Sequence, residues 1–196
     1  MRSKKTGTVR IIGGRWRGRR LPVADLPGLR PSGDRSRETL FNWLQADIRG
    51  ARCVDLFAGT GALGFEAASR GAASVLMIEK HPLAASFLQQ SADALQATQV
   101  TVCKGGAMRM LEDFMPDVFD IVFVDPPFDS NLGALVLERL DEIPLPNYVE
   151  GELDDKPVFQ RIDHRHAYNN ERLYAPDRMS AREHRLVRAA YWAMVD

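Results

Sequence analysis

The sequence predicts an α/β fold with a doubly wound, mostly parallel sheet, preceded by a basic amino-terminal arm. Three observations support this class: short apolar runs typical of buried strands, helix-favouring segments between them, and a glycine-rich turn after the first run. The 196 residues have the length of one ordinary domain. Strands and helices that alternate in this way form right-handed βαβ units, whose ligands bind at the carboxyl ends of the strands.

The first 37 residues form the basic arm. They carry eleven lysines and arginines against Asp25 and Asp34, which gives a charge of +9. Because the whole chain has no net charge, the remaining residues must carry −9. This asymmetry indicates a polyanionic partner, with a solvated basic tail as the alternative. Trp16 lies among the arginines, where it suits either stacking on a nucleic acid or the core of a hairpin.

The elements that follow the arm can be placed from their patterns. An amphipathic helix is expected over Glu38–Ile48, where apolar residues recur at Leu40, Trp43, Leu44 and Ile48. Four buried strands are predicted at Arg52–Phe57, Ser74–Glu79, Val100–Lys104 and Phe119–Asp125. The helices that follow these strands are predicted at Ala62–Arg70, Pro82–Leu95, Ala107–Met115 and Leu132–Leu140.

The turn after the first strand has the glycine spacing of a nucleotide-type cofactor site. Gly59 and Gly61 allow a sharp turn close to a ligand, and Gly64 allows the next helix to pack tightly on the strand. The amino terminus of that helix attracts a negative group. Glu79, at the end of the second strand, can accept both hydroxyl hydrogens of a ribose, which fits NAD and S-adenosylmethionine equally.

The tetrapeptide Asp125-Pro126-Pro127-Phe128 favours S-adenosylmethionine. The two prolines remove backbone donors and leave a rigid loop rich in acceptors. An aromatic amine is a poor nucleophile, but Asp125 and the Pro126 carbonyl can each accept one of its hydrogens and orient its nitrogen toward a sulfonium methyl. Phe128 offers a stacking face for the base. We therefore expect metal-free methyl transfer to a base that is unpaired or splayed out.

In this combination the motifs resemble the Rossmann-like class I methyltransferases, and within them the RsmD family of bacterial small-subunit rRNA guanine-N2 methyltransferases. Residues Arg10–Arg19 are similar to that family's RIIGGxWRGR segment, and Leu29–Trp43 to its LRPTxDRxRETLFNW block. The similarity covers residues 9–140. It implies S-adenosylmethionine as the cofactor and 16S rRNA, free or in a small ribosomal subunit, as the partner.

The resemblance and the motifs together divide the expected site residues into three groups. The catalytic group is Asp125, Pro126, Pro127 and Phe128. The cofactor-binding group is Arg30, Asp34, Asp55, Phe57, Ala58, Gly59, Thr60, Gly61, Gly64, Glu79, Lys80, Gly106 and Ala107. The RNA-binding group is Arg10, Arg15, Trp16, Arg17, Arg19, Arg20, Arg35 and Arg37.

Two stretches depart from the family pattern. The family usually has an acidic or amide residue for the cofactor adenine where this chain has Gly105-Gly106, so either backbone amides alone hold the adenine or the affinity for the cofactor is reduced. Beyond residue 144 the family continues with a fifth strand and a final antiparallel hairpin, and Tyr148–Glu150 is the one remnant of that strand in this sequence. The sequence instead indicates an acidic stretch over Glu150–Asp163 and a helix over Ser180–Met194.

The predicted organisation is a basic arm over residues 1–37, a methyltransferase core over 38–144 and a divergent segment over 145–196 that completes or caps the sheet. No apolar run is long enough for a membrane span or a signal core, so we expect a cytoplasmic monomer without membrane contact. Cys53 and Cys103 are expected to be core residues. No metal is expected, because strong ligand spacing is absent around His164, His166 and His184.

Three alternatives share parts of this pattern. A DNA methyltransferase acting on adenine N6 or cytosine N4 would use the same tetrapeptide, although the amino-terminal blocks favour rRNA guanine. An NAD-dependent oxidoreductase is disfavoured because no acid for hydride transfer, such as a Tyr-Lys pair, is evident. A noncatalytic RNA-binding relative would keep the fold and lack turnover.

Overall fold

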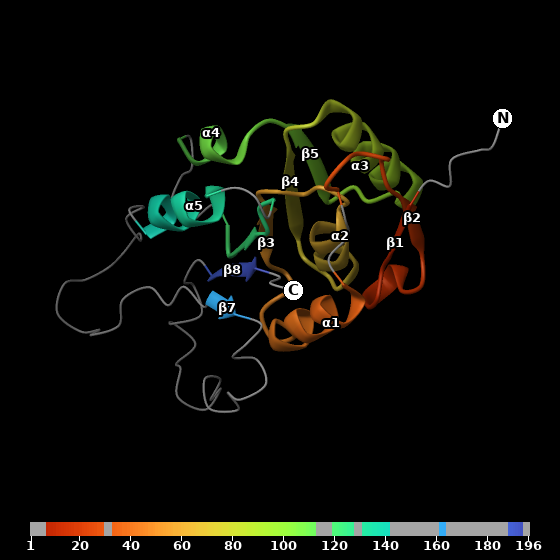
Figure 1. Cartoon of the computed structure of the whole chain (residues 1–196). Helices are drawn as coiled ribbons and strands as arrows, with labels where there is room; N and C mark the ends of the chain where they lie inside the picture. The colour runs from red at the N-terminus through yellow and green to blue at the C-terminus, as the bar shows by residue number, and fades with distance from the viewer. Residues whose placement is uncertain are drawn as a thin grey trace.

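The computed structural model describes residues 7–29, 33–112, 119–127, 131–141, 161–163 and 188–193. Within these ranges the chain forms a six-stranded sheet and a separate two-stranded hairpin, with helices packed on both faces of the sheet (Figure 1). The α/β class and the mostly parallel sheet predicted from the sequence are confirmed.

Strand β3 (Arg52–Asp55) lies inside the sheet. It pairs in parallel with β4 (Ser74–Glu79) on one side and with β6 (Ile121–Val124) on the other. Strand β5 (Val100–Lys104) extends the sheet beyond β4. The chain runs outward from β3 to β5 and then returns to β6, so the strand order reverses beside β3. Doubly wound sheets bind their ligands at the carboxyl ends of the strands at such a point.

The helices between these strands agree with their predicted positions. Helices α2 (Ala62–Ser69), α3 (Pro82–Leu95), α4 (Ala107–Glu112) and α5 (Leu132–Asp141) follow β3, β4, β5 and β6 in turn. Pro82 needs no hydrogen-bond partner for its nitrogen in the first turn of α3. His81 caps that turn, since its Nδ1 accepts from the Leu83 amide at 3.2 Å.

Helix α1 (Asp34–Trp43) begins four residues before the predicted start at Glu38 and ends before Ile48. The apolar pattern does not reveal the first turn because its residues are polar. A carboxylate there is favoured by the helix dipole, and Asp34 also pairs with Arg37 one turn later, at 2.6 Å. Ile48 lies past the end of the helix but stays buried.

Alternation along the strands divides the hydrophobic core between the two faces of the sheet. On one face, Cys53, Met77 and Phe123 pack with residues of α1, α2 and α3. On the other face, Val54 and Val122 pack with residues of α4 and α5. Cys53 is 0% exposed and is a core residue as expected, and its burial, with the nearby charges of Asp120 and Asp55, raises the pKa of its thiol to about 12.

The carboxyl-terminal segment adds strands to the sheet. Strand β8 (Arg188–Ala193) pairs in parallel with β6, and β7 (Arg161–Asp163) pairs in parallel with β8. The prediction of a helix over Ser180–Met194 is therefore wrong where the structure describes that segment. Tyr191 and Trp192 favour strands, and the open edge of β6 offers backbone groups that a further strand satisfies.

The basic arm forms a hairpin of β1 (Thr8–Arg10) and β2 (Arg20–Pro22) beside α2 and α3 (Figure 1). Its connection contains a short 3-10 helix, Gly14–Trp16, that lies against the end of α2. A Cβ at Gly14 would lie 1.9 Å from the Ser69 carbonyl oxygen, so only glycine fits there. Trp16 is 9% exposed and belongs to the core, which decides between the two roles that the sequence left open.

Glu66, in the middle of α2, fastens the hairpin to the core. The residue is 0% exposed. Its carboxylate accepts hydrogen bonds from the backbone amides of Ile12 and Gly13, each at 2.7 Å, and from Arg70 Nε at 2.7 Å. The guanidinium of Arg37 lies 3.7 Å from the same carboxylate. One buried charge therefore joins the hairpin, α1 and α2.

Several expected residues fall outside the described part of the chain. They are Arg30, Phe128, His164, His166, His184 and the Tyr148–Glu150 stretch. Among the residues that the structure does describe, no helix combines the length and the apolar character needed to cross a membrane.

Glu66→Gln is expected to lower the free energy of unfolding by about 3–5 kcal/mol, because it removes the charge that compensates two guanidinium groups inside the fold. Asp120→Asn is the matched control. It breaks a partly exposed ion pair, in which Arg52 Nη2 and Asp120 Oδ1 lie 2.9 Å apart, and should cost about 0–1 kcal/mol. Urea unfolding measures both changes, and equal losses would contradict the structural role given to Glu66.

Candidate active site

The carboxyl ends of β3, β4 and β6 bring three acidic residues to one edge of the sheet. Asp55 is opposite Met77 in β4 and opposite Phe123 in β6. Glu79 lies two residues beyond Met77 in the same strand, so the period of a strand gives it the same side of the sheet as Asp55. Asp125 directly follows the last residue of β6. The charges of both residues act on Asp55. The loops that carry the predicted cofactor and catalytic residues therefore meet.

Asp55 is the most deeply buried of the three acids, at 1% exposed. Its Oδ2 accepts from the Gly64 amide at 3.1 Å, while no group of the described residues hydrogen-bonds to its Oδ1. Burial raises the pKa of Asp55 to about 7, with smaller raising effects from Asp125 and Glu79 and an opposing effect of the Gly64 and Phe57 amides. The side chain thus offers one open acceptor, or a proton, beside the glycine turn.

Glu79 ties the glycine turn to the end of β4. Its Oε2 accepts from the Gly59 amide at 2.9 Å and its Oε1 accepts from the His81 amide at 2.7 Å. The sequence did not reveal this structural role. A carboxylate has about four acceptor positions, so the Glu79 oxygens keep capacity for the hydroxyl groups of a ligand.

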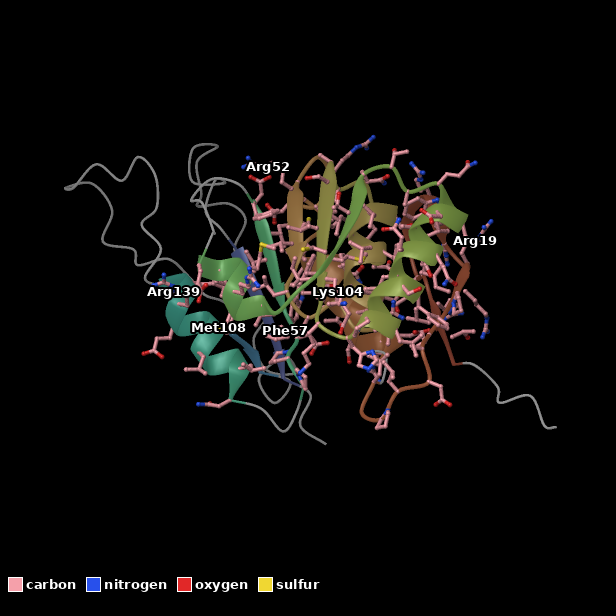
Figure 2. All side chains as sticks on the ribbon, turned by 90° about the horizontal axis from the view of Figure 1, so that it is seen from above. Arg19, Arg52, Phe57, Lys104, Met108 and Arg139 are labelled. Atoms are coloured by element: carbon pink, nitrogen blue, oxygen red, sulfur yellow. The ribbon has the colours of Figure 1, made fainter. Side chains whose placement is uncertain are left out.

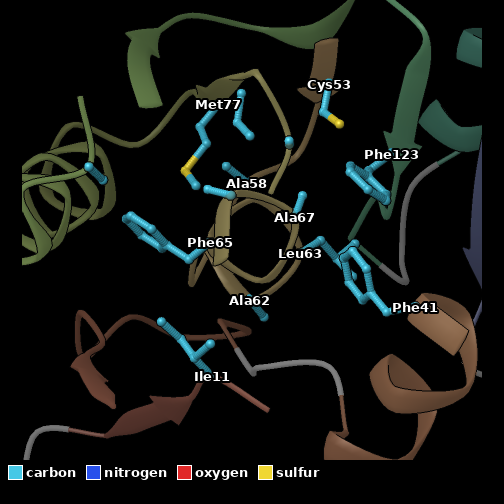
Figure 3. Packing of buried hydrophobic residues seen from close by; sticks show 14 of the residues in the cluster. Ile11, Phe41, Cys53, Ala58, Ala62, Leu63, Phe65, Ala67, Met77 and Phe123 are labelled. Carbon is cyan, nitrogen blue, oxygen red and sulfur yellow. The ribbon is translucent and has the colours of Figure 1, made fainter. Parts of the chain in front are cut away.

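The glycines of the turn serve packing as well as backbone geometry. Gly64 lies so close to β4 that a Cβ would come within 2.4 Å of the Met77 methyl carbon, so the tight packing predicted at Gly64 is present, against β4 and not the strand before the turn. Figure 3 shows the Met77 side chain beside α2. Gly61 has a φ of +78°, and a Cβ on it would be 2.6 Å from the Phe65 ring. The close approach at Gly61 is therefore to the core of the protein.

The other expected cofactor residues surround the same edge. Ala58, Thr60 and Ala107 are buried, Phe57 is half-buried and Lys80 is exposed. Phe57 packs against the core cluster under α4 and α5 (Figure 2). A Cβ on Gly105 or Gly106 would meet no atom of the described residues within 4 Å, so among them the space that a side chain could occupy beyond β5 is open.

The catalytic loop is described as far as its second proline. Asp125 and Pro126 are half-buried, Pro127 is exposed, and none of the three belongs to a helix or strand. β6 is held in place directly before the loop, where the Phe123 carbonyl accepts from the Leu56 amide at 3.1 Å. An acceptor-rich loop is thus anchored beside the turn that follows β3.

The arginines of the arm separate into two groups. Arg15, Arg17, Arg19 and Arg20 are exposed, and no ion pair holds any of them among the described residues. The Arg15 guanidinium lies over the Trp16 ring, 4.3 Å from its centroid. Arg19 lies on the outer side of the hairpin (Figure 2). This group forms an accessible cationic surface.

The second group is committed to the fold. The Arg10 side chain pairs with Asp34 at 2.9 Å. The Arg37 side chain is 1% exposed, so the expectation that it contacts RNA is corrected, as is the same expectation for the buried Trp16. Burial acts to raise the pKa of Asp34, but hydrogen bonds from Arg10 and Arg37 outweigh it and lower that pKa. Arg35 is exposed on α1.

Sequence reasoning missed Glu66 and Ser69, which bind the hairpin. Ser69 is 3% exposed; its Oγ accepts from the Trp16 amide at 3.0 Å and donates to the Gly13 carbonyl at 2.6 Å. The available signal was a charged residue in α2, a helix whose other side chains are small or apolar. A lone charge in such a helix needs a buried partner.

Comparisons with known proteins agree with this arrangement. The model of a family described as conserved hypothetical protein 95 matches residues 9–146. The ribosomal RNA small subunit methyltransferase D of Escherichia coli is 50% identical over 137 residues, which cover 70% of this chain and 69% of the relative. The Haemophilus influenzae protein of the same name is 44% identical over 160 residues, 78% of this chain and 82% of the relative. The solved structure of yhhF from Escherichia coli has a TM-score of 0.63 and 46% identity, covering 71% of this chain and 76% of that one.

Asp55→Asn is expected to change how stability depends on pH. The folded chain keeps a proton on Asp55 up to about pH 7, whereas the unfolded chain loses it near the ordinary value of 3.8. The stability of the parent therefore falls as the pH rises from 3.8 to about 7. Asparagine carries no proton to lose, so the stability of the variant does not fall for this reason. The free energy of unfolding of the variant minus that of the parent should rise by about 1.4 kcal/mol per pH unit and level off above pH 7. Urea unfolding across the window measures it, and a constant difference would contradict the buried, repelled carboxylate.

Proposed function

The chain belongs to the RsmD family of methyltransferases, whose family model is described as conserved hypothetical protein 95, and we propose that it methylates the N2 amine of a guanine in 16S rRNA with S-adenosylmethionine. The observation that carries the proposal is the meeting of Asp55, Glu79 and Asp125 at one edge of the sheet. It brings the glycine turn and the acceptor-rich loop into one site.

The residues at this edge fit S-adenosylmethionine. The amino end of α2 and the open Oδ1 of Asp55 suit the carboxylate and ammonium of its methionine part. The remaining acceptor positions of Glu79 suit its ribose hydroxyls. The open space at Gly106 and the buried Ala107 suit its adenine. Once bound, S-adenosylmethionine supplies a methyl group on a positively charged sulfur.

Asp125 and Pro126 act on the guanine amine. The Asp125 carboxylate and the Pro126 carbonyl each accept one of the two amine hydrogens, which turns the nitrogen toward the methyl group. The new N–C bond forms as the C–S bond breaks, and the nitrogen becomes positively charged. Asp125 stabilises that charge and accepts the proton that the nitrogen then releases. The products are an N2-methylated guanine and S-adenosylhomocysteine.

The exposed arginines of the hairpin supply the RNA surface. Arg15, Arg17, Arg19 and Arg20 have guanidinium groups that suit phosphate contacts. These arginines contact folded RNA next to the site. The target guanine leaves its base stack to reach Asp125. Positive charge thus holds the RNA, and the acceptors at the sheet edge select the amine.

Asp125→Ala should abolish methyl transfer and leave S-adenosylmethionine affinity nearly unchanged, because the loop after β6 holds the amine and the loops after β3 and β4 hold the cofactor. Asp120→Ala, at the opposite end of β6, is the matched control and should retain activity. Radiolabelled transfer to unmodified small subunits measures activity, and isothermal titration measures binding. Normal turnover by Asp125→Ala would remove the catalytic assignment.

Replacing Arg15, Arg17 and Arg19 with glutamine should weaken RNA binding and flatten its dependence on salt. Each lost phosphate contact should reduce the slope of log K against log salt by about 0.7–0.9. Fluorescence anisotropy with an rRNA fragment at several salt concentrations measures the slope. Arg52→Gln, an exposed arginine at the start of β3, should leave it unchanged. An unaltered slope for the triple variant would mean that the hairpin does not bind RNA.

A further inference from the structure

Arg37 connects the RNA-binding hairpin with the start of the cofactor helix. Its Nη2 donates to the Arg10 carbonyl in β1 at 3.0 Å and to Asp34 at 2.6 Å. Its Nη1 donates to the Ala62 carbonyl at 3.4 Å. Ala62 is the first residue of α2 and directly follows Gly61 of the glycine turn. A single buried guanidinium therefore contacts both of the parts that the reaction must align.

Glu66 and Ser69 complete this connection along α2. Glu66 accepts from two successive amides of the hairpin, and Ser69 binds the Gly13 carbonyl and the Trp16 amide. Sliding the hairpin over α2 would break several hydrogen bonds between buried groups at once. Such networks hold one geometry, since a partly satisfied arrangement leaves buried donors without acceptors.

The segment between the hairpin and α1 touches the glycine turn as well. A Cβ on Gly59 would lie 3.2 Å from Leu29 Cδ1, so the two residues are in close contact. Leu29 also packs against the core cluster that contains Val9 and Leu21 of the hairpin. The glycine turn thus has contacts with the arm near Gly59 and, through Arg37, at Ala62.

We propose that Arg37 and Glu66 are positioning residues for methyl transfer. They hold the hairpin at a fixed orientation to the glycine turn, so that RNA bound by the exposed arginines presents its guanine amine in line with the methyl group. The inference rests on the proposed function. Transfer needs a near-attack geometry, and a misplacement of about 1 Å can cost a hundredfold in rate.

Arg37→Lys tests this role. Lysine keeps the positive charge but lacks the planar guanidinium that donates to the Arg10 and Ala62 carbonyls and to Asp34 at once. We expect kcat on unmodified small subunits to fall by about tenfold to a hundredfold. The KM for RNA and the affinity for S-adenosylmethionine should stay near parent values, because Arg15, Arg17 and Glu79 are untouched. Arg52→Lys is the matched control on an exposed ion pair, and it should keep the parent kcat.

Ser69→Ala is the second variant, in case Arg37→Lys does not fold. It removes two hydrogen bonds to the hairpin without leaving a charge unpaired, and it should lower kcat with little change in KM. The amides of Ile12 and Gly13 should exchange hydrogen faster in this variant, while those of α3 should not.

If the parent is active and the Arg37→Lys and Ser69→Ala variants are equally active, the inference is overturned and the proposed function is not. A loss confined to the KM for RNA would also overturn it, since that pattern assigns these residues to binding. A parent chain that transfers no methyl group to rRNA would contradict the proposed function, and the inference with it.

Discussion

Strand β3 lies between β4 and β6, and its parallel pairing on both sides sends three loops out of the sheet at one edge. The strand period places Glu79 on the side of the sheet that Asp55 occupies, and Asp125 directly follows β6 at the same edge. The raised pKa of Asp55 reflects its burial first and, to a smaller extent, repulsion by the other two carboxylates. Ligand groups that are positively charged or that donate hydrogen bonds would offset this repulsion. The sulfonium and ammonium of S-adenosylmethionine, its ribose hydroxyls and the guanine amine are such groups.

The hairpin depends on the same helix as the site. Helix α2 begins at the glycine turn and carries Glu66 and Ser69 toward its other end, so one short helix binds the arm and shapes the cofactor loop. This arrangement explains why the arginines of the arm divide into a group bound within the fold, the exposed Arg10 and the buried Arg37, and a group that makes no ion pair among the described residues. Arg10 and Arg37 build the connection, and the four arginines around the tip of the hairpin remain available for phosphate.

The sequence predicts the elements that local patterns determine and misses those set by distant contacts. Apolar runs and glycine spacing locate β4, β5, α3 and the tight packing at Gly64. Charge alone cannot separate Arg37 from Arg17, because the difference lies in Glu66, which is far along the chain. The helix predicted over Ser180–Met194 was wrong for β8 because an open sheet edge outweighs local helix propensity.

The most direct test of the account is mass spectrometry of nucleosides from the 16S rRNA of cells that lack this protein and of the same cells after it is restored. The account predicts that one guanosine gains an N2-methyl group when the protein returns. Unchanged rRNA, or a methyl group on a ring carbon or a ribose oxygen, would contradict the claim that the acceptors at this sheet edge grip an exocyclic amine.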